Sequence, residues 1–160
     1  MSFRLAAAAA LGVLTAVPTA ASAQVLMQRD VSLRMALTIA EAALAECGTN
    51  TSVAVVDRAG RLRVFLQGDN ANPHNIELAR RKAYTARTFR RSSAEWAQRT
   101  AEGGLVGQRM LADVIPLGGG LPIMVGNETI GAVGVSGAPG QDKDEACARA
   151  GLAKVADQLK

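Results

Sequence analysis

The sequence predicts an α/β protein of the α+β kind, in which helices pack on a mainly antiparallel β-sheet. Segments with helical periodicity stand near both ends and in the middle of the chain, and two pairs of apolar, β-rich runs stand between them. Each pair is joined by a short turn, at 58–61 and at 126–128, and strands joined so closely run antiparallel. The order α-β-β-α-(α)-β-β-α therefore favours one layered domain.

The first 23 residues are expected to lie outside this domain. Arg4 supplies a positive charge, Leu5–Val17 is an apolar run, and 21–23 (Ala-Ser-Ala) matches the A-x-A cleavage pattern. The run is too short to span a bilayer, although a retained anchor is the alternative. We expect a secretory signal peptide over 1–23, a single domain over 24–160, a periplasmic or secreted location, and no stable membrane insertion after cleavage.

Composition limits the function classes. The chain is 49% hydrophobic but only 3% aromatic, so its core must be built mainly from Ala, Val, Leu and Ile. The net charge of +4 is too small to indicate nucleic-acid binding, and the sequence holds no DNA- or RNA-recognition motif. We therefore expect no nucleic-acid partner.

The first helix is predicted over 31–47, with Ser32 as its cap and Gly48 at its end. Two strands follow, Ser52–Asp57 and Leu62–Gln67, and Asp57 is expected to open the turn between them. The apolar stripe of the helix is expected at four positions with helical spacing: Leu33, Leu37, Ala40 and Leu44.

The second helix is predicted over 76–89 and a weaker helix over 93–101, whereas 103–113 is ambiguous. A hairpin is predicted from 121–125 and 129–136, and a closing helix over 142–159 has an acidic first turn. The apolar stripes are expected at Ile76, Ala79, Ala83 and Ala86 in the second helix, and at Ala146, Ala150, Ala153 and Leu159 in the last.

Three successive glycines, Gly118, Gly119 and Gly120, precede the hairpin. Glycine adopts backbone angles closed to other residues, and it lets a flat or anionic ligand come close to the main chain. The alternative is that these glycines only turn the chain where two elements pack closely. The sequence leaves both readings open.

Four blocks are similar, in order and spacing, to the GlcG/HbpS-like family, which also occurs as the C-terminal domain of PduO-type proteins. They are SVAVVDRAGRL, IELARRKAYTARTF, PLGGGLPI and IGAVGVSGAPGQDKDEACARAGL. The resemblance covers the chain from Val31 to its C-terminus and implies a profilin-like fold and a homo-oligomer, often an octamer. Together with the predicted signal peptide, it implies an exported small-molecule-binding protein whose cofactor is haem or a related tetrapyrrole.

Two other functions remain open. One is a small enzyme or accessory protein that acts on a carboxylate, such as a hydroxy acid, and the other is an oligomeric scaffold without a small-molecule site. The sequence lacks a G-x-S-x-G elbow, an H-E-x-x-H motif and a phosphate-loop pattern, so it does not decide whether the protein is an enzyme.

Haem requires an axial ligand, an apolar slot and cations for the propionates. His74 is the only histidine and the candidate iron ligand, and the alternative is an exposed loop histidine. PduO-type domains carry the haem histidine near their start, where this chain reads QVLMQRDVSL and has none. A methionine or Tyr84 is the alternative iron ligand, although a methionine in an alanine-rich core more often only fills space.

The basic second helix supplies the other ligand-binding candidates. Arg80 and Arg87 lie on roughly one stripe and can hold a propionate or another carboxylate. Lys82 lies in the family's A-x-x-K-A-x-T-A pattern and is expected to point toward the loop of Gly118, Gly119 and Gly120. A solvated helix face or a salt-bridged subunit interface is the alternative for the arginines.

The two cysteines, Cys47 and Cys147, leave two interpretations open. Two cysteines in an exported chain favour a disulfide. The implied fold also puts the first and last helices on one side of the sheet, which makes contact between the two cysteines possible. The alternative is a plain buried thiol at Cys147. Two cysteines and one distant histidine do not favour a zinc site.

Overall fold

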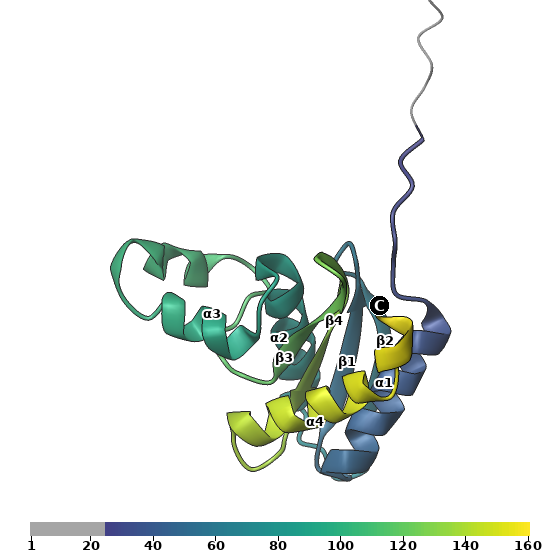
Figure 1. Cartoon of the computed structure of the whole chain (residues 1–160). Helices are drawn as coiled ribbons and strands as arrows, with labels where there is room; N and C mark the ends of the chain where they lie inside the picture. The colour runs from purple at the N-terminus through teal and green to yellow at the C-terminus, as the bar shows by residue number, and fades with distance from the viewer. Residues whose placement is uncertain (1–24) are drawn as a thin grey trace, which may run out of the picture.

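The structure, a computed structural model, describes residues 25–160 (Figure 1). The predicted signal peptide therefore lies outside the described residues. No helix in the described part is long and apolar enough to span a membrane. The elements are α1 (Leu33–Cys47), β1 (Ser52–Asp57), β2 (Leu62–Gln67), α2 (Asn75–Phe89), α3 (Ser93–Arg99), the 3-10 helix η1 (Gly103–Met110), β3 (Gly120–Val125), β4 (Glu128–Ser136), α4 (Gln141–Ala153) and the 3-10 turn η2 (Ala156–Gln158).

The four strands form one antiparallel sheet in the order β2-β1-β4-β3, which confirms the predicted fold class. β1 lies in the middle, where Ser52 pairs with Ser136 and Asp57 pairs with Gly131. The turn after β1 forms as predicted, because the Asp57 carboxylate accepts hydrogen bonds from the backbone amides of Ala59 and Arg61, each at 2.9 Å.

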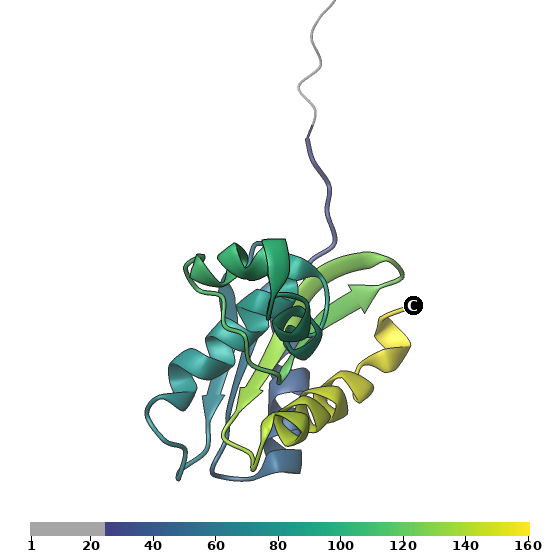
Figure 2. The ribbon, with the colours of Figure 1, turned by 90° about the vertical axis from the view of Figure 1, so that its left-hand side faces the viewer.

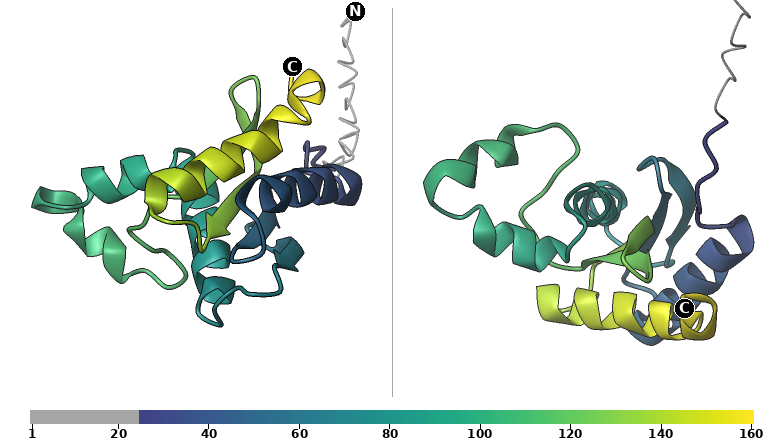
Figure 3. Two further views of the ribbon diagram at one scale, coloured as in Figure 1. Left: turned by 90° about the horizontal axis from the view of Figure 1, so that it is seen from below. Right: turned by 45° about the horizontal axis from the view of Figure 1, so that its top comes forward.

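Helices cover both faces of the sheet. α1 and α4 pack side by side on one face, and α2 lies on the other face over β4, β1 and β3 (Figure 3). The main core lies on the α1–α4 side and is built from aliphatic side chains such as Ile39, Val55 and Val133. On the α2 side the contact is made by Val56, Ala83, Ala86 and Ala132.

Small residues set the spacing between α2 and the sheet. A Cβ atom on Gly134 of β4 would overlap the carbonyl oxygen of Ala79 and lie 2.5 Å from the backbone nitrogen of Ala83. The helix backbone therefore rests almost directly on the strand backbone. A close-packed interface of this kind explains how a chain with 3% aromatic residues builds a dense interior.

The predicted apolar stripes of α1 and α4 are partly wrong. In α1, Leu33 and Leu37 are 57% and 36% exposed. In α4, Ala146 and Ala153 are exposed, and the helix ends at Ala153 instead of reaching Leu159. The buried stripes are Ala36, Ile39, Ala40 and Ala43 in α1, and Asp144, Cys147, Ala148 and Gly151 in α4.

The reason is that α1 and α4 approach each other closely, so the smallest side chains face the contact. A Cβ atom on Gly151 would lie 2.5 Å from the carbonyl oxygen of Ile39 and 3.1 Å from the Ala43 methyl carbon. In α2 the predicted alanines are buried, whereas Ile76 is 41% exposed.

The ambiguous stretch after α3 forms η1, and together they make a lobe beside the sheet (Figure 2). Trp96 anchors the lobe, since its ring stacks on Phe89 of α2 with 4.7 Å between the ring centroids. Its indole nitrogen donates a hydrogen bond to the Gln108 side chain at 3.2 Å.

Candidate functional site

Lys82 lies where α2, β4 and α4 meet. Its ammonium nitrogen is 2.6 Å from a carboxylate oxygen of Asp144, and the two side chains are only 3% and 6% exposed. The same nitrogen donates to the carbonyl oxygen of Val135 at 3.1 Å. The other carboxylate oxygen of Asp144 accepts from the backbone amide of Ala138 at 2.9 Å. This buried ion pair therefore joins elements from three parts of the chain.

The structure places Lys82 beside the glycine loop, as its position in the motif predicts. A Cβ atom on Gly119 would lie 3.2 Å from the lysine nitrogen. Asp144 neutralises the positive charge of Lys82, so this charge is compensated inside the protein. A direct contact between Lys82 and a ligand stays a prediction.

The three glycines of the loop differ in backbone conformation and in hydrogen bonding. Only Gly119, at φ +113°, has backbone angles closed to other residues. The amide of Gly118 donates to the Gln141 side chain at 2.5 Å, and that of Gly120 donates to the Ser93 hydroxyl at 2.8 Å. The loop is thus buried and hydrogen-bonded to its own chain, which supports the packing interpretation of these glycines.

Replacing Gly120 with alanine is expected to lower the free energy of unfolding by about 1–3 kcal/mol, since the core there has no room for a methyl group. The added Cβ would overlap the carbonyl oxygen of Lys82 and lie 2.6 Å from its carbonyl carbon. Urea unfolding measures the change. Gly104→Ala is the matched control, because nothing lies within 4 Å of its Cβ position. Equal stability of the two variants would contradict the expectation.

Arg80 and His74 do not lie together with Lys82 in one site. Arg80 forms ion pairs with Glu77 at 2.9 Å and with Asp113 at 2.6 Å, and the hydrogen bond that it donates to Asp113 is the main reason that its pKa is raised. His74 precedes the first turn of α2, where it is exposed and makes no capping hydrogen bond. Arg80 is therefore bound to carboxylates of its own chain.

Arg87 lies near the opposite end of β4 from Lys82. It lines a cavity of about 190 Å³ together with Arg58, Arg90, Asn127, Glu128 and Thr129. Burial lowers the pKa of Arg87, and the positive charges of Arg58 and Arg90 lower it further. The predicted ligand-binding residues are therefore divided along α2, with Lys82 beside the glycine loop at the middle of the helix and Arg87 near its C-terminal end.

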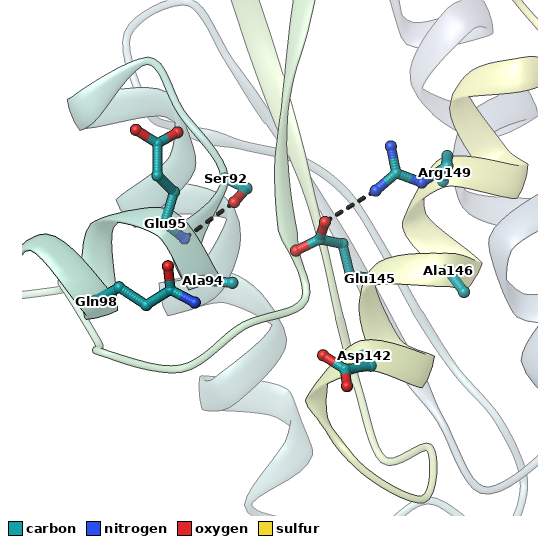
Figure 4. A pocket seen from close by; sticks show the side chains of 8 residues that line it. All are labelled: Ser92, Ala94, Glu95, Gln98, Asp142, Glu145, Ala146 and Arg149. Carbon is teal, nitrogen blue, oxygen red and sulfur yellow. Dashed lines mark hydrogen bonds and ion pairs between the residues drawn. The ribbon is translucent and has the colours of Figure 1, made fainter.

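A groove lies between α3 and the first turns of α4 (Figure 4). It consists of two adjoining cavities of about 390 and 570 Å³, which share Ala94, Gln98 and Asp142. Glu95 and Glu145 face it from opposite walls, and Arg149 pairs with Glu145 at 2.9 Å. Its charged lining residues are three carboxylates and the arginine that pairs with Glu145, which suits a cationic or hydrogen-bonding molecule better than an anionic one.

Cys47, at the end of α1, and Cys147, on α4, form a disulfide with 5.8 Å between their Cα atoms. This decides between the two interpretations of the cysteines. No cluster of three or more metal-ligating side chains occurs among residues 25–160.

Sequence reasoning missed the residues that hold the glycine loop and Lys82 in place. Asp144 is predicted only as part of an acidic first turn, yet it is the buried partner of Lys82. Ser93 and Gln141 are not predicted as loop contacts, although each accepts a hydrogen bond from a loop amide. The available signal for Asp144 is its place in the buried stripe that also carries Cys147 and Gly151.

Comparison with known proteins agrees with this fold. A double mutant of HbpS from Streptomyces reticuli is 35% identical, with a TM-score of 0.77 over 87% of this chain and 97% of that one. A PduOC–haem complex is 23% identical, with a TM-score of 0.71 over 78% of this chain and 94% of that one, and shows the shared fold.

A curated relative is the uncharacterized 15.0 kDa protein of the dhaT–dhaS intergenic region of Citrobacter freundii. It is 31% identical over 100 residues, which cover 61% of this chain and 70% of the relative. The family described as "Haem degrading protein HbpS-like" matches residues 30–153. Because this match covers most of the chain, the protein belongs to the HbpS-like family, as the four sequence blocks predict.

Proposed function

We propose that the protein binds haem or a related tetrapyrrole as a homo-oligomer, after export to the periplasm or beyond. The observation that carries the proposal is the similarity to HbpS, at 35% identity over 87% of the chain, within a family described as haem-degrading. The Cys47–Cys147 disulfide supports export, because such bonds persist in oxidising compartments.

One protomer does not supply a complete haem slot among the described residues. The α3–α4 groove is lined by Glu95, Asp142 and Glu145, which would repel propionates. His74 offers an accessible imidazole, but it does not line either of the two cavities with an apolar lining beside α1. We therefore propose that haem lies at the surface near His74 and that a second copy of the chain closes the slot.

Titration of the purified protein with haemin tests this proposal. We expect a saturable, stoichiometric shift of the Soret band that is lost in His74→Ala, because the variant removes the only imidazole. Asn72→Ala, an exposed neighbour in the same loop, is the matched control. Light scattering with and without haemin reports whether the binding species is an oligomer.

Two results would change the assignment. Absence of a saturable shift in the wild-type protein would overturn haem binding. A shift that survives His74→Ala would overturn the ligand assignment and direct the search to Tyr84 and the methionines.

A further inference from the structure

The cavity at the end of α2 contains more positive charge than its own chain neutralises. Arg58 pairs with Glu128, and Arg29 lies 3.9 Å from the same carboxylate. No ion pair to Arg87 or Arg90 occurs among residues 25–160. The free charge in the cavity therefore belongs to these two arginines.

Arg87 also has an unused hydrogen-bond donor. Its Nε atom is shielded from solvent and has no acceptor in the described part of the chain. A buried donor without a partner is costly, and native structures leave few of them. Arg87 lines the cavity, so an anion bound there would offset this cost by its charge.

Neighbouring acidic groups do not fill this role. Asp30 and Asp57 raise the pKa of Arg87 by their charge, but burial and the two nearby arginines outweigh them. One carboxylate oxygen of Asp57 holds the amides of its own turn, and one of Asp30 accepts from the amides of Val31 and Arg58. Both are thus engaged in fixing the chain beside the cavity.

We propose that this cavity, lined by Arg58, Arg87 and Arg90, binds a small oxyanion of the carboxylate or phosphate class. A planar guanidinium donates two parallel hydrogen bonds to either group. The Asn127 and Thr129 side chains line the same cavity, whose volume of about 190 Å³ suits a small ion or acid. The proposal does not rest on haem binding, because the cavity lies away from His74, beside the β3–β4 turn.

The test measures thermal unfolding of the purified protein without haemin, as phosphate, acetate or glycolate replaces chloride at constant ionic strength. A bound anion raises the unfolding temperature in a saturable way. The Nε–H signal of Arg87 in an NMR spectrum should shift along the same titration. We expect Arg87→Gln to weaken the affinity by about tenfold or more, because it removes a charged donor.

Two further variants make the test sharper. Glu128→Gln should tighten anion binding, since it removes a negative charge from the cavity wall and frees Arg58. Arg99→Gln removes the same charge from an exposed site on α3 and should leave binding unchanged. Without anion, Arg87→Gln should not destabilise the protein, because it removes a half-buried charge that has no ion-pair partner among residues 25–160.

The titrations also identify the source of the oxyanion. Tighter response to phosphate than to acetate assigns a phosphate ligand, and the reverse assigns a carboxylate. Competition between acetate and haemin would place a haem propionate in the cavity and would contradict the placement of haem near His74. No saturable response in the wild type, or equal responses in wild type and Arg87→Gln, would overturn the proposal.

Discussion

Replacing Lys82 with methionine is expected to lower the free energy of unfolding by about 3–5 kcal/mol. The variant would leave the Asp144 carboxylate buried without a counter-charge, with its side chain only 6% exposed. It would also remove the donor to the Val135 carbonyl oxygen. The loss should appear in urea unfolding as a lower transition midpoint with little change in slope.

The control for this prediction is the neighbouring exposed lysine of α4. Lys143→Met makes the same chemical change and should leave stability within about 0.5 kcal/mol. The double variant Lys82→Met, Asp144→Asn should recover part of the loss, because a neutral amide costs less to bury than an unpaired carboxylate. A loss below about 1 kcal/mol for Lys82→Met would show that the ion pair is not what holds α2 to α4.

The strands were predictable because their apolar runs are bounded by strong turn signals. β1 and β2 have the predicted bounds, and β3 and β4 each begin one residue early. The chemistry of the turns determines such boundaries locally, as the Asp57 carboxylate does between β1 and β2.

The buried faces of α1 and α4 were less predictable, because alanine occurs on several sides of each helix. Hydrophobicity then favours the leucines, whereas close packing selects the small residues that allow two backbones to meet, such as Ala43 and Gly151. Size, and not hydrophobicity alone, determines the face.

The site was predictable only where a local motif carries it. Lys82 and the glycine loop do lie together, but the partner of Lys82 stands 62 residues away in α4. Pairing over that distance depends on how α2 and α4 sit on opposite faces of the sheet. Likewise, Arg80 and Arg87 lie on the same basic helix. Of these two arginines, only Arg80 forms ion pairs with carboxylates of the described residues.

Removing the Cys47–Cys147 disulfide is expected to cost about 2–5 kcal/mol of unfolding free energy. The bond joins residues 100 positions apart, so it closes a long loop in the unfolded chain. It also ties the end of α1 to the buried stripe of α4, where the two helices pack closely. The double variant Cys47→Ala, Cys147→Ala should therefore unfold at lower urea concentration and lower temperature than the oxidised wild type.

Reduction separates the bond from the loss of the sulfur atoms. Dithiothreitol should lower the unfolding temperature of the wild type and leave that of the double alanine variant unchanged, because only the wild type has a bond to break. If the wild type does not respond to the reductant, the bond contributes nothing to stability. Protein recovered from the periplasm should contain no free thiol, whereas protein made without residues 1–23 in the cytosol should contain two. Recovery of the full chain from the periplasm tests the proposed export, and the thiol count tests whether the bond forms in that compartment.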